Sequence, residues 1–142
     1  MRRLILLART ARAAAEVVEH TQLRHGLNSA QADLLLTLYR SAPPEGLTPS
    51  QLTELSAISA SSVTNRLDRL TAEGMIERRT DAHDARARRV SLTPAGRQRV
   101  EALLPDHLAG EVQLLSALTE SEQAELERLL LRLLEGLETG ED

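Results

Sequence analysis

Arginines are concentrated in the middle of this 142-residue chain, where their spacing could bind a polyanion. Residues 59–99 contain nine arginines and five acidic residues, a net charge of +4. All 17 basic residues of the chain are arginine, whose planar guanidinium group donates paired hydrogen bonds to phosphates and to guanine edges. The whole chain carries -4, because eleven acidic residues and two arginines follow residue 99. This segregation of charge predicts that the basic middle contacts nucleic acid.

Within the basic segment, residues 59–73 have the pattern of a short amphipathic helix. Val63, Leu67 and Leu70 share one helical face, and the opposite face is small and polar. Such a face fits closely into a major groove, where hydroxyl, amide and guanidinium groups bind base edges. The alternative is an ordinary solvated helix surface. The candidate DNA contacts on this helix are Ser61, Ser62, Thr64, Asn65, Arg66 and Arg69.

A β-hairpin is predicted after this helix, with strands at 75–79 and 88–92 and a polar tip between them. Arginine on such a hairpin suits phosphates or a narrow minor groove, although a solvated charge run is the alternative. We expect Asp81 and Asp84 to pair with neighbouring arginines and to fix the tip. The candidate DNA contacts on the hairpin are Arg78, Arg79, Arg86, Arg88 and Arg89.

Two helices lie directly before residue 59 and must position the basic segment. Asn28 or Ser29 can cap the first of them, and its inward face is predicted to contain Leu34, Leu35 and Leu38. The second begins with a capping box over 48–51, with proline at the first helical position, and runs through Leu55. A tight turn then leads into the helix at 59–73, so the pattern is typical of a helix-turn-helix.

Amphipathic helices are also expected at the two ends of the chain. Apolar stripes at residues 4–18 and 126–137 predict the first and last helices, and a capping box at Thr119 opens the last one. Another helix begins at Thr93, and Pro105 is expected to kink it or divide it in two. The expected fold is therefore mainly α-helical with a small β-hairpin that follows a helix-turn-helix, flanked by N- and C-terminal helices.

Missing residue types exclude several kinds of site. The chain has no cysteine, which excludes disulfides, thiolate metal sites and thiol-based sensing of oxidants. Tyr39 is the only aromatic residue, so stacking platforms for single-stranded nucleic acid are absent and duplex DNA is the expected partner. Arginines interrupt the apolar N-terminus, and no apolar run approaches the roughly 20 residues of a membrane span. We therefore expect a cytoplasmic protein without a membrane partner.

From its second helix to its last, the chain resembles the MarR family of winged helix-turn-helix transcriptional regulators. The stretches that carry the resemblance are 67–70, 73–79, 84–87 and 92–97. The resemblance implies that Arg86 contacts DNA from the wing and that Asp84 supports it. It also implies a homodimeric repressor, built from the first and last helices, that binds a near-palindromic site. We expect one domain over 1–142, with a DNA-binding region at about 29–99 and dimerisation helices at about 1–25 and 100–138.

The resemblance further implies a small-molecule effector that binds between the dimerisation helices and the head. The candidate effector contacts are Arg12, His20, His25 and Tyr39. No sequence pattern selects these four over a structural role.

Other classes of function fit the sequence less well. It contains no GxSxG, HExxH, P-loop or dinucleotide-binding glycine pattern, so we expect no enzyme and no cofactor. A metal-responsive regulator is an alternative, because the pairs Glu16/His20 and His107/Glu111 are each four residues apart on one helical face. Solvated helix residues are the more frequent explanation, so no metal site is predicted. A winged-helix module that binds protein is the remaining alternative, and it would not require so many arginines.

Overall fold

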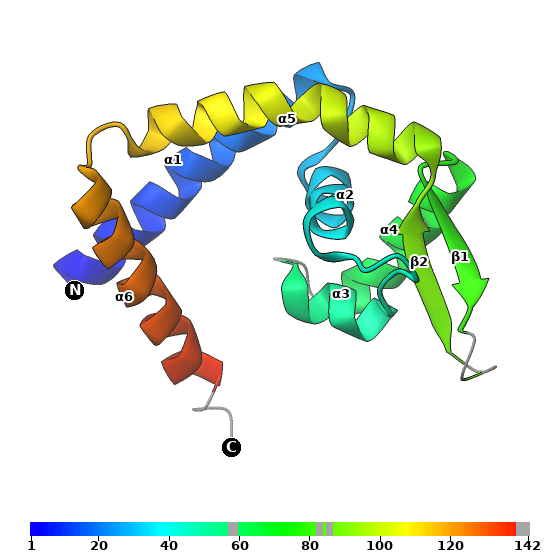
Figure 1. Cartoon of the computed structure of the whole chain (residues 1–142). Coiled ribbons are helices and arrows are strands. Elements are labelled where there is room, and N and C mark those ends of the chain that lie inside the picture. Colours follow the sequence, from blue (N-terminus) through cyan, green and yellow to red (C-terminus); the bar gives the residue numbers. More distant parts are fainter. Residues whose placement is uncertain (57–59, 82–83, 85–86, 139–142) are drawn as a thin grey trace.

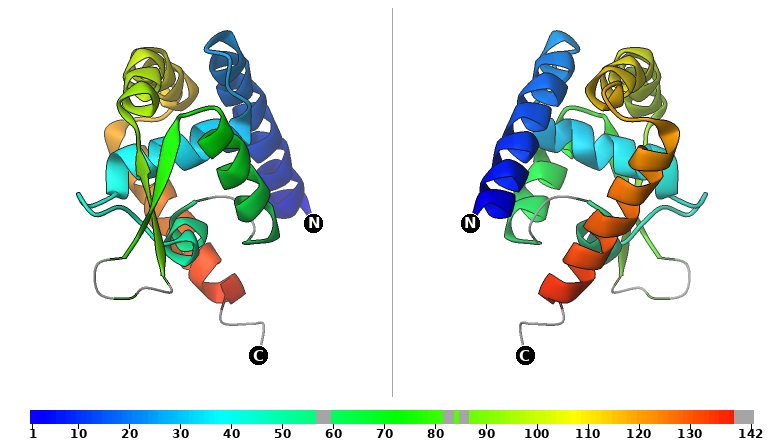
Figure 2. Two further views of the ribbon diagram at one scale, coloured as in Figure 1. Left: turned by 90° about the vertical axis from the view of Figure 1, so that its right-hand side faces the viewer. Right: turned by 90° about the vertical axis from the view of Figure 1, so that its left-hand side faces the viewer.

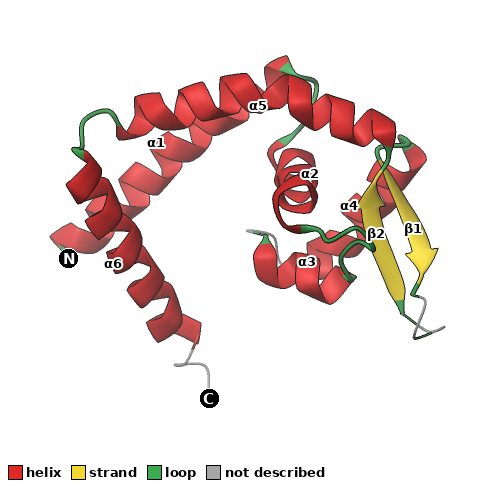
Figure 3. Cartoon of the chain, viewed as in Figure 1, coloured by secondary structure: helices red, strands yellow, loops and turns green. Residues whose placement is uncertain are grey.

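The computed structural model describes residues 1–56, 60–81, 84 and 87–138, without the side chains of residues 60–62 and 138. This part of the chain forms helices and one two-stranded antiparallel hairpin, as expected (Figure 3). In chain order the elements are α1 (Arg2–Arg24), α2 (Ser29–Ser41), α3 (Pro49–Leu55), α4 (Ala60–Ala72), β1 (Ile76–Thr80), β2 (Arg88–Leu92), α5 (Pro94–Leu115) and α6 (Glu120–Glu138).

Side-chain caps fix where the helices begin. The side-chain oxygen of Asn28 accepts a hydrogen bond from the backbone NH of Gln31 at 2.9 Å. The hydroxyl oxygen of Thr48 likewise accepts one from the backbone NH of Gln51 at 3.2 Å. Both are complete capping boxes. Thr93 caps α5, and its hydroxyl oxygen accepts from the backbone NH of Gly96 at 3.0 Å. These predicted starts are confirmed. For α4 the sequence offers Ser59 or Ser61 as the cap; the helix begins at Ala60, so Ser61 lies inside it, and Ser59 lies outside the described residues.

The head consists of α2, α3, α4 and the hairpin, and the first turns of α5 close it (Figure 1). Its apolar core is continuous and includes the predicted inward residues of α2 and α4. The core residues are Leu27, Ala32, Leu34, Leu35, Leu38, Leu47, Leu52, Val63, Leu67, Leu70, Ile76, Val90, Val100 and Leu103.

The hairpin pairs Ile76 with Leu92 and Thr80 with Arg88, so β1 begins one residue later than predicted. The reason lies at the end of α4, where the backbone NH of Met75 bonds to the carbonyl of Leu70 and extends the helix cap. The loop between α2 and α3 forms an isolated antiparallel β-bridge with β2. In it Leu47 and Val90 exchange backbone hydrogen bonds of 3.0 and 2.8 Å.

The long helix α5 is continuous from Pro94 to Leu115, so the division predicted at Pro105 is wrong. Pro105 lies on an exposed side of the helix, where water can bond the carbonyl that the missing NH leaves unpaired. Figure 1 shows α5 arching from the head to the far end of the molecule.

The terminal helices lie beyond the head. α1 packs along α5, and α6 turns away from the end of α5 (Figures 1 and 2). Large apolar side chains are exposed on both: Leu4 is 71% and Leu137 is 70% accessible. Among the described residues, none of the helices combines the length and apolar character that crossing a bilayer would require.

Candidate nucleic-acid interface

Helix α4 has the two faces that its sequence predicts. Val63, Leu67 and Leu70 are almost fully buried against the head, which fixes the rotation of the helix. Thr64 and Asn65 are exposed on the other side, so their hydroxyl and amide groups are accessible from solvent. Of the other predicted contacts on α4, Arg66 is half-buried and Arg69 is exposed, while Ser61 and Ser62 lie in the helix with side chains outside the description.

The C-terminal end of α4 is tied to the N-terminal end of α2. The amide of Gln31 donates to a carboxylate oxygen of Glu73 at 2.9 Å, and Gln31 is itself buried. The other oxygen of Glu73 accepts from Nε of Arg69 at 3.0 Å. Gln31 therefore performs two tasks, because its side chain also completes the cap of α2. Sequence reasoning identified neither Gln31 nor Glu73, because their contact joins residues 42 positions apart.

The exposed arginines next to α4 are paired with carboxylates in the DNA-free protein. Arg78 of β1 contacts Asp68 of α4 at 2.6 Å, and Arg79 contacts Glu77 at 2.7 Å. Arg79 remains 72% accessible. Such surface pairs contribute only about 0–1 kcal/mol, so a phosphate can replace the carboxylate at little cost. Arg88 is also exposed, and it donates to the hydroxyl of Thr80.

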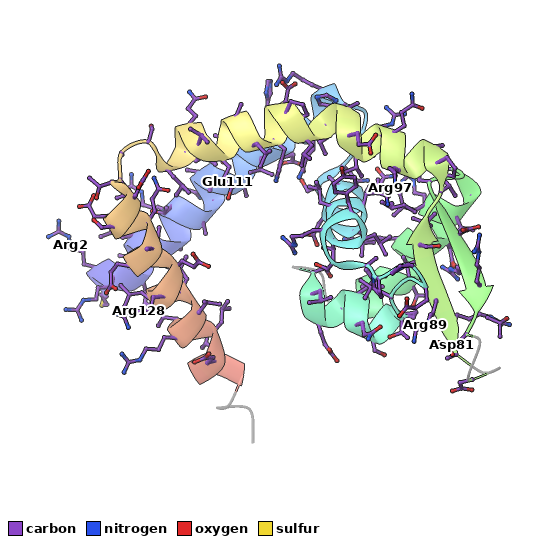
Figure 4. The ribbon with its side chains drawn as sticks, viewed as in Figure 1. Arg2, Asp81, Arg89, Arg97, Glu111 and Arg128 are labelled. Atoms are coloured by element: carbon purple, nitrogen blue, oxygen red, sulfur yellow. The ribbon has the colours of Figure 1, made fainter. Side chains whose placement is uncertain are left out.

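Arg89 differs from these arginines because its side chain is held inside the fold. Its Nε pairs with Asp81, and its Nη1 donates to the backbone carbonyl of Gly46 at 3.0 Å. The side chain of Asp81 is only 7% accessible and that of Arg89 only 25%. Figure 4 shows the two residues together at the end of the strands, where the tip begins. The predicted pairing of Asp81 with a neighbouring arginine is thus confirmed.

The tip itself, residues 81–87, is only partly described. The backbone NH of Asp84 donates to the carboxylate of Asp81 at 3.1 Å, and its carbonyl accepts from the backbone NH of Ala87 at 3.0 Å. The backbone of Asp84 therefore takes part in the turn, and its support of Arg86 stays a prediction. Arg86, the predicted wing contact, lies outside the described residues.

The structure does not bring the four predicted effector contacts into one site. Arg12 lines a shallow depression on α1, and His20 lines a groove between α1 and α5. His25 is bonded to Asp106 of α5 at 2.9 Å, and this hydrogen bond lowers the pKa of the carboxyl group, an effect that the charge of Arg24 reinforces. Only Tyr39 reaches a cavity between the head and the long helices. The four therefore line different parts of the surface: Arg12 and His20 lie on α1, His25 follows its last turn, and Tyr39 lies on α2.

That cavity, at the junction of α1, α2 and α5, has a volume of about 640 Å³. Leu36, Leu104 and Leu108 give it an apolar wall. Gln22 of α1 also lines it and is 4% accessible, and its side-chain oxygen has no hydrogen-bond partner within the described structure. Because this oxygen is itself buried, a ligand could donate to it only after the glutamine side chain turned toward the cavity, and the new hydrogen bond would favour that turn. Sequence reasoning did not identify Gln22, because no pattern distinguishes this glutamine from others in a helix.

The pairs considered as metal ligands stay apart. Glu16 and His20 line the groove between α1 and α5, whereas His107 and Glu111 line the junction cavity. Within the described part of the chain, no three acidic or histidine side chains gather in a group that could hold a metal ion.

A model of the MarR family matches residues 25–87, which contain α2 to α4 and β1. The chain is 32% identical to the HTH-type transcriptional regulator PecS of Dickeya dadantii over 77% of its own length and 66% of the relative. It is 28% identical to the HTH-type transcriptional repressor YetL of Bacillus subtilis over 89% of its length and 75% of the relative. The chain thus spans just under two thirds of PecS and three quarters of YetL.

A solved structure of a mutant MarR from E. coli, complexed with operator DNA, has the same fold. The TM-score is 0.79 and the sequence identity 25%, over 91% of each chain. Helices and a two-stranded wing therefore occur in the same arrangement in a protein crystallised on DNA.

Proposed function

Because the chain belongs to the MarR family of transcriptional regulators, we propose that it binds a near-palindromic operator as a homodimeric repressor that a small molecule releases. The observation that carries DNA binding is the exposed polar face of α4 beside an arginine-bearing hairpin. The head, at about 29–99, binds DNA, and the helices at about 1–25 and 100–138 form the dimer.

Specificity and affinity come from different parts of this surface. Thr64 and Asn65 are placed to bind base edges in the major groove, where side-chain hydrogen bonds distinguish base pairs. Arg79 and Arg88 lie on the exposed hairpin and contact phosphates, which adds affinity without sequence preference. Ser61, Ser62, Arg66, Arg69, Arg78 and Arg86 complete the proposed interface.

The dimer is supported by the apolar surface of the terminal helices and by their charge. The leucines of α6 are between 36% and 70% accessible in the single chain, which is unusual for a stripe of this size. Residues 2–12 carry four arginines and no acidic residue, whereas residues 120–138 carry six glutamates and two arginines. Opposite charges on α1 and α6 favour the packing of one copy's α1 against the other copy's α6.

Repression and release rest on two observations. The relatives YetL of B. subtilis and MprA of E. coli are named as transcriptional repressors. The junction cavity is lined by α1 and α5, which belong to the proposed dimer helices, and by α2 of the head. A ligand there would therefore contact both parts. Its leucine wall and the unpartnered oxygen of Gln22 suit a small apolar molecule with a hydrogen-bond donor.

Substitutions on α4 and on the hairpin should affect DNA binding in different ways. Asn65→Ala and Thr64→Ala are expected to relax sequence preference, by about 1–3 kcal/mol for each base-edge hydrogen bond that is removed. Arg88→Ala should weaken binding to all duplexes alike and reduce the log–log salt slope by about 0.9. Fluorescence anisotropy with operator and scrambled duplexes across a salt series measures both effects.

A lack of salt-sensitive DNA binding by the wild-type protein would contradict the proposed function. It would favour the alternative of a winged-helix module that binds protein. If the α4 and hairpin variants behaved alike, the division between specificity and affinity would be wrong.

A bulky residue in the junction cavity should prevent release by an effector. Leu108→Trp places an indole at the half-exposed rim of the cavity, so it would occupy the space that a ligand needs. Screening small aromatic acids and amines for release of labelled operator identifies active compounds. Those compounds should lose their effect on the variant, relative to its own ligand-free affinity. Unchanged release would place the effector elsewhere.

A further inference from the structure

The pairing of Arg89 separates it from the other arginines of the hairpin. We propose that Arg89 and Asp81 are positioning residues, which fix the base of the wing tip against the loop after α2 and do not contact DNA themselves. This inference rests on the proposed function, because it assigns a role within the DNA-binding surface.

Two of the three guanidinium nitrogens of Arg89 already bond within the fold. Nε bonds to the carboxylate of Asp81, and Nη1 bonds to the carbonyl of Gly46 at 3.0 Å. To turn its Nε and Nη1 outward to a phosphate, Arg89 would have to leave a carboxylate whose side chain is almost fully buried. Breaking such a pair strands a buried charge, which costs far more than the exchange of partners at an exposed arginine. The surface pair of Arg79 and Glu77, on the same hairpin, has no such barrier.

Asp81 connects the ion pair to the tip. Its carboxylate accepts from the backbone NH of Asp84 at 3.1 Å, and its own backbone NH donates to the carbonyl of Ala87 at 3.1 Å. The carboxylate therefore binds both a strand arginine and the turn of the tip. An acidic side chain next to a polyanion is unfavourable unless it is neutralised. Pairing with Arg89 explains why Asp81 can occupy this position.

The loop that receives Arg89 is itself held firmly. Gly46 has a φ of +88°, and a Cβ added there would lie 2.4 Å from the carbonyl oxygen of Val90. The next residue, Leu47, exchanges two backbone hydrogen bonds with Val90. The ion pair thus joins the ends of the two strands, where the tip begins, to a fixed point on the head.

The direction in which one substitution changes operator affinity distinguishes positioning from direct contact. Asp81→Asn removes a negative charge from the DNA-binding surface and breaks the ion pair. If Arg89 contacted phosphate, the variant would bind operator more tightly, because the arginine would be released. We expect the opposite, a loss of about tenfold in operator affinity, because the tip loses its fixed position.

A second carboxylate on the same hairpin provides the matched control. Glu77→Gln also removes a negative charge next to an arginine, but its pair with Arg79 is on the surface. This control should bind operator as tightly as the wild type or more tightly. Arg89→Gln should also weaken operator binding, and the double variant should lose less than the sum of the two single losses, because both substitutions remove the shared ion pair.

Affinities are measured by anisotropy at a temperature where circular dichroism shows each variant to be folded. If the ion pair only stabilised the fold, its removal would lower the melting temperature and leave the operator affinity of the folded protein unchanged. That result would contradict positioning. Tighter binding by Asp81→Asn, or additive losses in the double variant, would contradict it too. The wild-type titration separates these outcomes from a failure of the proposed function, in which the wild type itself would show no salt-sensitive binding.

Discussion

Gly96→Ala is expected to destabilise the protein by about 3 kcal/mol, because its new methyl group would overlap the backbone of another element. Gly96 lies in the first turn of α5, where a Cβ would lie 1.9 Å from the carbonyl oxygen of Met75. That oxygen also accepts a hydrogen bond from the backbone NH of Thr93 at 3.1 Å, so it is held from two sides. Relief would require α5 to move away from the turn between α4 and β1, and urea denaturation measures the cost.

The same substitution later in α5 serves as the control. A Cβ at Gly110 would meet only the Thr21 hydroxyl, at an ordinary distance of 3.9 Å. Alanine is favoured over glycine in a helix interior by about 1 kcal/mol, so Gly110→Ala should stabilise the protein. Stability changes of opposite sign at the two positions of one helix would show that the contact at Met75, and not helix propensity, determines the effect at Gly96. Losses of equal size at both positions would contradict this explanation.

Local signals made much of the fold predictable. The caps at Asn28, Thr48 and Thr93 involve residues three apart, so their hydrogen bonds can be read directly from the sequence. The apolar spacing of α4 likewise predicted which side is buried, because helical rotation is fixed once the core residues are identified. The polar face with Thr64 and Asn65 followed from the same rotation.

Features that depend on contacts between distant residues could not be predicted. The sequence shows Arg79 and Arg89 as equivalent arginines on two strands, but only the fold brings Gly46 within reach of the second. Similarly, no sequence pattern distinguishes Gln22 from the candidates on α1, because its role depends on packing against α2 and α5. The continuity of α5 at Pro105 also depends on exposure to solvent, which allows water to replace one hydrogen bond.

Helix α2 connects the three parts on which the proposed regulation depends. Gln31 at its first turn bonds to Glu73 of α4, and the loop after its last turn bonds to Arg89 and Val90. Between these ends, Leu36 lines the junction cavity. A ligand that displaced α2 would therefore act on α4 and on the hairpin at the same time.

Disrupting the leucine surface of α6 is expected to have the largest effect on operator binding. A double substitution, Leu130→Glu with Leu133→Glu, places two charges on one side of a helix whose leucines are exposed in the single chain. If these leucines form the dimer interface, burying the charges would be prohibitive and the protein would become monomeric. A monomer engages a single half-site, and loss of the linked second half-site reduces affinity by a factor on the order of 100 or more.

The control for charge itself is Arg132→Glu, because this change makes α6 more acidic on the side opposite Leu130 without removing a leucine. Sedimentation equilibrium should find the control dimeric and the leucine variant monomeric, and anisotropy should find full operator affinity only in the control. Both variants should keep a folded head, since its core contains no residue of α6. A leucine variant that stays dimeric, or a monomer that binds operator as tightly as the wild type, would exclude α6 as the interface on which DNA binding depends.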